Sequence, residues 1–357
     1  MDVQILDISN PLWTNTLEVV HHDVYHLPQY FYLEAQRINA TAEAILIAAG
    51  EKIFFLPYLL RQGEILVNSE TKQKILDVIS PYGYPGFLLS DAAANTPEFL
   101  RSVINQLTQI LHERQVCSAF IRLHPLLNNS VDKYSDSVKI NGETVSIDLT
   151  LSESELWQQT RPDQRNKINR AKRFGFQTRM VPPRQFIKVF NKVYEEAMDR
   201  VGAKRLYYFG EDFFEKLADS LGDKIHLCLV ELNEEVACAG LFTECCGIVQ
   251  YHLSGTSTNF LKLAPNVLML DYVRLWAKER GNLDFHLGGG VGGSREDSLY
   301  KFKAGFSKRR NTFLTLRLIV NVEKYHYLVD LQARALQTDS TTLLNSGFFP
   351  AYRFSGF

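Results

Sequence analysis

Phe302 and Lys303, near the end of the chain, are the residues whose types and surroundings most directly suggest chemistry. Upstream of them, an apolar segment at residues 283–287 runs into three consecutive glycines at 288–290. Glycine lets backbone N–H groups approach an anion closely, and a lysine adds a point charge. The arrangement predicts a site for an anionic carrier or for a charged transfer intermediate. The structural alternative is a solvated lysine in a basic run beside a core aromatic residue.

His286 ends the apolar segment just before the glycines, at the expected edge of a cleft. An imidazole with an ordinary pKa of about 6.5 suits removal of a proton from an ammonium group, so His286 is the first candidate for a general base. Glu244 and Asp271 are weaker candidates, and His286 also fits a purely structural role. A protein base is dispensable if the amine arrives partly deprotonated.

A helix is expected from Pro265 to about residue 280, and its first turn is a candidate anion site. Backbone N–H groups at a helix N-terminus attract phosphate, and a nearby cation strengthens that attraction. The residues concerned are Lys262, Asn266, Val267 and Leu268. An ordinary helix start gives the same sequence pattern.

A basic segment and an aromatic loop each allow either a binding role or a purely structural role. Arg165 belongs to a basic segment that would line an acceptor channel or contact an RNA-like carrier, or else form a charged helix face. Tyr82 and Tyr84 alternate with Gly83 between two prolines, in a rigid loop that would stack on a base or sugar, or else form a structural turn.

The elements that must position these residues occur twice along the chain. Strand–turn–strand patterns at residues 45–58 and 227–242 predict two β-hairpins. Each is followed by a helix that begins at a proline, Pro97 or Pro265, and then by a strand. The repeat indicates an internal duplication of one α/β unit, although two unrelated α/β stretches would share such generic patterning. We expect domains at residues 1–150 and 151–320, with a helix and tail at 321–357 packing on the body.

Composition excludes several classes of protein. The 357 residues carry a net charge of −1, which argues against general binding to nucleic acid or membranes. No signal peptide is visible, and the longest apolar stretch, at residues 53–60, is far shorter than the ~18 residues of a membrane span. The five cysteines form no C-x-x-C pair, which predicts reduced thiols in a cytoplasmic protein. No His/Cys pairing has the spacing of a structural zinc site, so no metal is expected.

The basic segment at residues 165–175 resembles a run, R-n-x-I-x-x-A-x-K-x-G, of the Fem-type transferases that build peptidoglycan cross-bridges. The sequence Tyr207–Phe209 resembles their Y-F element, and Phe302–Lys303 resembles their F-K element. The resemblance spans about residues 150–310. It implies an α/β fold of two tandem GNAT-like domains, each with a mixed, mainly antiparallel sheet flanked by helices.

The resemblance also implies roles for individual residues. Lys204 and Tyr208 stand where an Arg and a Tyr of the family hold a sugar-nucleotide diphosphate, and four-residue spacing would put them on one face of a helix. Tyr251 matches a tyrosine of the donor–acceptor cleft, and Lys303 would stabilise an oxyanion beside Phe302. A lysine in place of the arginine exchanges a bidentate clamp for a point charge.

Three functional hypotheses follow. The favoured one is an N-acyltransferase that moves an acyl group from acyl-CoA to the amine of a dTDP- or UDP-linked deoxyamino sugar, for surface polysaccharide synthesis, as relatives of the same architecture do. The second is a Fem-type transferase that uses aminoacyl-tRNA and a peptidoglycan precursor. The third is a non-catalytic domain pair that binds a nucleotide sugar. The sequence has no G-x-S-x-G motif and no Cys/His pattern, which favours direct attack, and we expect a monomer with no DNA partner.

Overall fold

The computed structural model describes residues 1–66, 72–128, 131 and 135–355. Residues 356–357, at the end of the aromatic C-terminal run, lie outside that description. The chain forms two compact units: unit 1 comprises residues 1–141 and 313–357, and unit 2 comprises residues 142–312. The chain therefore passes between the units within two strands, β7 (Val138–Asp148) and β13 (Arg310–Ile319).

Unit 1 is built on a mixed sheet with the strand order β1-β2-β3-β4-β6-β13. Its strands are β1 (Asp2–Asp7), β2 (Ala40–Ala49), β3 (Lys52–Leu66), β4 (Lys72–Ile79), β6 (Ser118–Arg122) and β13, while β5 (Leu88–Leu89) pairs with β3. Neighbouring strands are antiparallel except for β4 and β6, which are parallel and connected through a helix.

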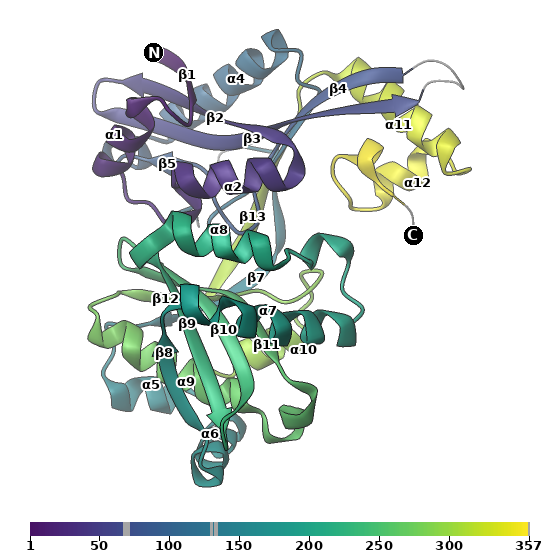
Figure 1. The fold of residues 1–357 in the computed structure, drawn as a ribbon. Coiled ribbons are helices and arrows are strands. Elements are labelled where there is room, and N and C mark those ends of the chain that lie inside the picture. The colour runs from purple at the N-terminus through teal and green to yellow at the C-terminus, as the bar shows by residue number, and fades with distance from the viewer. Residues whose placement is uncertain (67–71, 129–130, 132–134, 356–357) are drawn as a thin grey trace. The chain divides into compact units, whose positions relative to one another are not determined.

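Helices cover both faces of this sheet. Along β2, Ile45 and Ile47 pack into the cluster that contains the apolar stripe of α4, whereas Ala44 and Leu46 pack with residues of α1 and α2. This alternation follows from the two-residue period of a strand. The helices are α1 (Pro11–Val19), α2 (Pro28–Ile38), α3 (Asp91–Ala94), α4 (Pro97–Glu113), α11 (Val322–Ala335) and α12 (Ser340–Asn345), labelled in part in Figure 1.

The C-terminal segment belongs to unit 1. Residues of α11, α12 and the short 3-10 helix Ala351–Arg353 form a core cluster with Ile75 and Cys117. A buried carboxylate fastens this segment, because Asp77 on β4 accepts hydrogen bonds from Arg61 on β3 and from both Tyr352 and Arg353.

Unit 2 repeats the plan of unit 1 with the strand order β8-β9-β10-β11-β12-β7. Its strands are β7, β8 (Gln177–Val181), β9 (Ile225–Leu232), β10 (Glu235–Cys245), β11 (Ile248–Thr256) and β12 (Asp284–Gly288). Here too all neighbours are antiparallel except one pair, β11 and β12, which α9 connects. The helices are α5 (Glu153–Gln159), α6 (Pro162–Phe174), α7 (Pro183–Arg200), α8 (Glu211–Leu221), α9 (Pro265–Glu279) and α10 (Ser298–Ala304).

The two sheets match strand for strand, as the predicted duplication requires. In both sheets neighbouring strands among the first four are antiparallel, and the second and third form a hairpin. The fourth strand leads through a helix to the fifth, which is parallel to it. The sixth strand of each sheet does not follow the fifth along the chain. In unit 1, β6 pairs with β13, which comes after all of unit 2, and in unit 2, β12 pairs with β7, which comes before the other strands of that unit. The predicted α/β class, with mixed and mainly antiparallel sheets flanked by helices, is confirmed.

Local sequence explains where many helices begin and end. Proline occupies the first turn of α2, α4, α6, α7 and α9, where its missing N–H costs nothing. Ser152 and Glu155 form a capping box at the start of α5, and Gly175 ends α6 in the left-handed conformation. No helix among the described residues is long and apolar enough to cross a membrane.

Candidate active site

Lys303 is held in place by the loop that joins β12 to α10. Its side chain is only 8% exposed, and Nζ donates a hydrogen bond to the carbonyl oxygen of Gly289 at 2.7 Å. Asp297 caps α10 by accepting a hydrogen bond from the N–H of Tyr300, at 2.9 Å. The glycines are needed here, because a Cβ at Gly290 would overlap the Asp297 carboxylate. The loop therefore fixes the ammonium group rather than leaving it in solvent.

Tyr251 lies against the same ammonium group. Lys303 Nζ is 5.7 Å from the centre of the Tyr251 ring, a distance that suits a cation–π contact. The ring is stacked on Phe242, with centroids 5.5 Å apart, and the phenol hydroxyl is hydrogen-bonded to Ser254. The structure thus brings together two of the three residues that we predicted to be catalytic.

A β-bulge in β11 adjoins Tyr251. Leu253 pairs with Leu241 and Tyr251 pairs with Phe242, so the register shifts by one residue at His252. Bulges re-aim neighbouring side chains and are over-represented next to active sites. This bulge could not be predicted, because an extra residue in a strand leaves the local apolar pattern nearly unchanged.

The electrostatics of Lys303 suit stabilisation of developing negative charge. Burial lowers the pKa of Lys303 to about 8, and attraction to Asp297 only partly offsets the effect. The side chain is therefore mostly protonated near pH 7 in a poorly solvated position, where a charge acts more strongly than in water. Burial also raises the pKa of Tyr251, so its hydroxyl stays neutral and can act as a hydrogen-bond donor.

Phe302 is half-buried, and hydrogen bonds at Phe302 and nearby Gly305 join α10 and its C-terminal end to α6. Its ring meets Phe306 edge-on with centroids 5.5 Å apart, and its carbonyl oxygen accepts a hydrogen bond from Gln164 Nε2 at 3.2 Å. The carbonyl oxygen of Gly305 accepts from the N–H of Arg161 at 2.8 Å. Arg165 follows Gln164 on α6 and is half-buried. Helix α6, which carries the predicted binding residue Arg165, thus supports the end of α10, the helix that carries Lys303.

His286 is fully buried on β12, not at a cleft edge as expected. Its Nδ1 lies 2.7 Å from the side-chain oxygen of Gln250, the residue opposite it on β11. Since an amide oxygen only accepts, Nδ1 carries the proton in this pair. A base must reach the proton that it removes, so this role would need a structural change to expose the ring. The role of His286 stays a prediction.

The start of α9 has an exposed lysine that favours anion binding, but part of its backbone is already hydrogen-bonded. Lys262 is exposed in the 3-10 helix Thr258–Leu263, three residues before Pro265, and Asn266 is half-buried. The N–H of Val267, however, already donates to the carbonyl oxygen of Ala264 at 3.2 Å, and the side chains of Val267 and Leu268 are buried in the core. Part of the predicted cradle is therefore used by the fold itself.

Lys204 and Tyr208 would share a face only if the stretch between them were an α-helix, and it is not. Helix α7 ends at Arg200, Gly202 adopts a positive φ of 58°, and only residues 205–207 form a short 3-10 helix, with Lys204 and Tyr208 flanking it. Both side chains are exposed, and the Tyr208 hydroxyl donates to Asp199 at 2.9 Å. A binding role for either residue must come from a loop.

Tyr82 and Tyr84 belong to unit 1, in the loop after β4. The backbone of Tyr82 is fixed on α2, because its N–H donates to Glu34 at 2.7 Å and its carbonyl oxygen accepts from Tyr30 at 2.9 Å. The Tyr84 ring meets Phe313 edge-on at 5.1 Å. Both rings are half-buried, so the loop is a packed structural turn that still presents part of each ring.

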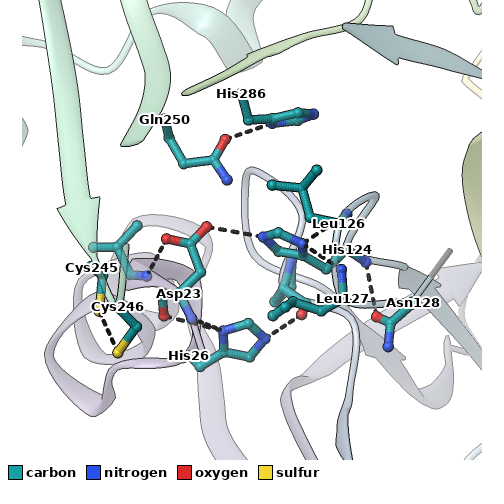
Figure 2. Close-up of polar contacts among 12 residues, drawn as sticks. Asp23, His26, His124, Leu126, Leu127, Asn128, Cys245, Cys246, Gln250 and His286 are labelled. Carbon is teal, nitrogen blue, oxygen red and sulfur yellow. Dashed lines mark hydrogen bonds and ion pairs between the residues drawn. The ribbon is translucent and has the colours of Figure 1, made fainter. Parts of the chain in front are cut away.

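A cluster of histidines in unit 1 is structural (Figure 2). His124 Nδ1 accepts two backbone N–H groups, from Leu126 and Leu127, so Nε2 carries the proton that is donated to Asp23 at 3.0 Å. His26 likewise accepts at Nδ1 from the N–H of Asp23 and donates from Nε2 to the carbonyl oxygen of Pro85. Both nitrogens of each ring serve the fold, which leaves no atom for catalysis.

A pocket of about 250 Å³ lies elsewhere in unit 2, among α5, α6 and α9. Its lining includes Trp157, Lys172 and Arg274, together with Asp271, which the sequence offered as a weaker candidate for a general base. Arg274 is 2% exposed and donates to Thr160 at 2.6 Å and to Asp271 at 2.5 Å, so it ties α9 to the end of α5. We interpret this group as structural.

Comparisons with known proteins bear on the fold and on one segment of the chain. Residues 131–237 match the model of the FemAB family. This segment, less than a third of the chain, is similar to the FemAB family. The match includes α6 and the segment with Lys204 and Tyr208, and it ends before Tyr251 and Lys303. A comparison with curated protein sequences gave no match.

Solved structures show the fold. FemX is 14% identical with a TM-score of 0.67, covering 92% of this chain and 99% of that one. The L-PGS protein from Bacillus licheniformis is 15% identical with a TM-score of 0.54, covering 87% of this chain and 92% of that one. Such low identities establish a common fold and nothing finer. They show that the chain shares the fold of FemX, as the resemblance to Fem-type proteins implied.

Sequence reasoning missed the residues that support Lys303. Glu143 on β7 accepts a hydrogen bond from the Tyr300 hydroxyl at 2.6 Å and is clamped by the Arg295 guanidinium, which fixes the loop and α10 together. Ser254 and Gln164 have similar supporting roles for Tyr251 and Phe302. The pairs with Glu143 and Gln164 join residues more than 130 positions apart, so no local pattern could reveal them.

Proposed function

We propose that the protein is an N-acyltransferase, in which an amine attacks the carbonyl carbon of an activated acyl donor next to Lys303. The C–N bond forms, the bond to the leaving group breaks, and the amine proton passes to solvent or to the leaving group. Attack puts negative charge on the carbonyl oxygen, and a fixed cation is most effective there. The observation that carries this proposal is the buried Lys303 held between the carbonyl oxygen of Gly289 and the Tyr251 ring.

We propose further that the donor is an aminoacyl-tRNA and the acceptor a peptidoglycan precursor. The FemAB match supports this donor over the acyl-CoA that the sequence favoured. The start of α9 also offers less to a pyrophosphate than expected, since the Val267 N–H is already bonded to Ala264. The basic residues of α6, among them the exposed Lys167, Arg170 and Arg173, would contact RNA phosphates despite a net charge of −1.

Acyl transfer from acyl-CoA to a nucleotide-linked amino sugar is the second candidate. The exposed Lys262 just before the N-terminus of α9 favours it, because a helix start with an adjacent cation attracts phosphate groups. The proposed chemistry at Lys303 is the same for both donors.

A donor panel distinguishes the candidates. Purified protein is mixed with a UDP-linked muramyl peptide and aminoacylated tRNA, or with acetyl-CoA and UDP- or dTDP-linked amino sugars, and amide products are measured by mass spectrometry. We expect product with aminoacyl-tRNA, abolished by ribonuclease and weakened by salt. If product forms only in the mixtures of acetyl-CoA with an amino sugar, the second candidate is established. Binding of a nucleotide sugar without any transfer would leave a non-catalytic protein and overturn the proposal.

A further inference from the structure

The turn between β10 and β11 in unit 2 places two adjacent thiols side by side. Cys245 ends β10 and pairs with Ile248, so Cys246 and Gly247 form a two-residue hairpin turn. Both turn residues have positive φ, 46° for Cys246 and 79° for Gly247, as the tightest hairpin turns require. Glycine, Asn or Asp usually occupies the position of Cys246, so the cysteine there has a conformational cost.

The two sulfur atoms are 3.9 Å apart, and Figure 2 shows the side chains directed toward each other. This separation excludes a disulfide, whose sulfurs lie about 2.05 Å apart. It agrees with the separation of two thiolates on one tetrahedral Zn²⁺ ion. Two Zn–S bonds of about 2.3 Å at the tetrahedral angle place the sulfurs about 3.8 Å apart. The pair is thus already spaced for chelation.

The pair is also reachable from solvent. Cys246 is exposed, while Cys245 is 5% exposed beside it. The other three cysteines are buried, and burial raises the pKa of Cys117 to about 11, that of Cys238 to about 12, and that of Cys228 well above its usual value. Thiolate is the form that binds metals, so those three thiols are poor ligands.

We propose that Cys245 and Cys246 form a dithiolate site for a thiophilic d¹⁰ cation such as Zn²⁺. This departs from the expectation of no metal, which rested on the spacing of the His and Cys residues in the sequence. Binding converts two thiols and one Zn²⁺ into a bis-thiolate complex and releases two protons, so affinity rises with pH. Water or other ligands would fill the remaining coordination positions. The site is independent of the acyltransferase proposal.

A Cd²⁺ titration of the reduced full-length protein tests this proposal, because cadmium thiolates absorb in the near ultraviolet. We expect one equivalent of tight binding, competed by Zn²⁺, and a loss of at least about tenfold in affinity in both Cys245→Ser and Cys246→Ser. Cys117→Ser is the matched control and should bind like the parent. Binding that survives in the two turn variants, or that is absent from the parent protein, would overturn the proposal.

Phenylarsine oxide gives an independent readout. It condenses with two neighbouring thiols to form a cyclic dithioarsinite and one water, without any oxidant. We expect one adduct per chain by intact mass, absent from Cys246→Ser and present in Cys117→Ser. An unmodified parent protein would show that the two thiols do not act together. Folding of each variant is checked by circular dichroism.

Discussion

At the scale of single residues, Lys303 shows how burial and a few contacts hold an ammonium group in one place. A lysine in solvent stays charged far above neutral pH but has its field weakened by water. The contacts of Lys303 with Gly289 and the Tyr251 ring keep the ammonium group in place, while burial brings its pKa down to about 8. The charge is therefore present at neutral pH and is lost in mildly alkaline solution.

Turnover should fall as pH rises through about 8, because deprotonation of Lys303 removes the positive charge beside the oxyanion. The measurement is the pH profile of turnover with saturating donor and acceptor. Lys303→Arg keeps its charge to much higher pH, so it should lose the alkaline decline while retaining part of the activity. An unchanged decline in Lys303→Arg would assign it to another group.

His26 should make the protein sensitive to acid. Burial, followed by repulsion from His124, lowers the pKa of His26 to about 3. The unfolded chain binds this proton below about pH 6.5 and the folded chain does not, so stability falls as pH drops from about 6.5 toward 3. The slope should reach about 1.4 kcal/mol per pH unit.

Urea unfolding of the parent and of His26→Gln between pH 7 and 4 measures this slope. The variant should be less stable at pH 7 and lose less stability on acidification. The exposed His326 supplies the control, since His326→Gln should keep the slope of the parent. Equal slopes in all three proteins would contradict the assignment.

At the scale of elements, the loop between β12 and α10 has little tolerance for change. A Cβ at Gly290 would overlap Asp297, the residue that caps α10 and attracts Lys303. Nothing lies within 4 Å of a Cβ at Gly292 in the same loop, although its φ is 73°. The two glycines therefore differ in steric freedom while sharing one segment.

Gly290→Ala should displace the cap of α10 and lower turnover by at least about tenfold, whereas Gly292→Ala should cost about 1 kcal/mol of stability and little activity. Turnover and thermal unfolding of both variants measure the difference. Similar activities in the two variants would show that the position of α10 does not control the reaction.

Sequence alone predicted the elements that local patterns encode. The two hairpins, α4 and α9 follow from apolar periodicity with a proline at each helix start, and all four are present. The pairing of β6 with β13 was not predictable, because it joins residues nearly 200 positions apart. The same limit applies to the site, where Phe302–Lys303 and Tyr251 came from motifs but Glu143 and Gln164 did not.

At the scale of the whole molecule, the positions of β7 and β13 along the chain determine which parts of it can fold alone. Strand β13 completes the sheet of unit 1 but follows unit 2 in the sequence. Unit 2 is one continuous segment, residues 142–312, whereas unit 1 needs residues 313–357 in addition to 1–141. The sequence suggested a domain at residues 1–150, which would lack the strand that pairs with β6 and the segment that pairs with Asp77.

A fragment of residues 142–312 should therefore unfold cooperatively by itself, while a fragment of residues 1–150 should be unstable or aggregate. Joining residues 1–141 to residues 313–357 through a flexible linker should restore a cooperative transition. Circular dichroism and thermal unfolding of the three fragments provide the test. A stable, cooperative 1–150 fragment would contradict this division of the chain.

The most direct measurement is single-turnover amide formation by the parent protein and by Lys303→Met, with the donor that the panel identifies. Methionine keeps the length of the side chain and removes its charge, so transfer should slow by at least about tenfold while donor binding and the thermal transition change little. Equal rates of transfer in a folded Lys303→Met would contradict the claim that this buried ammonium group stabilises the reaction's transition state.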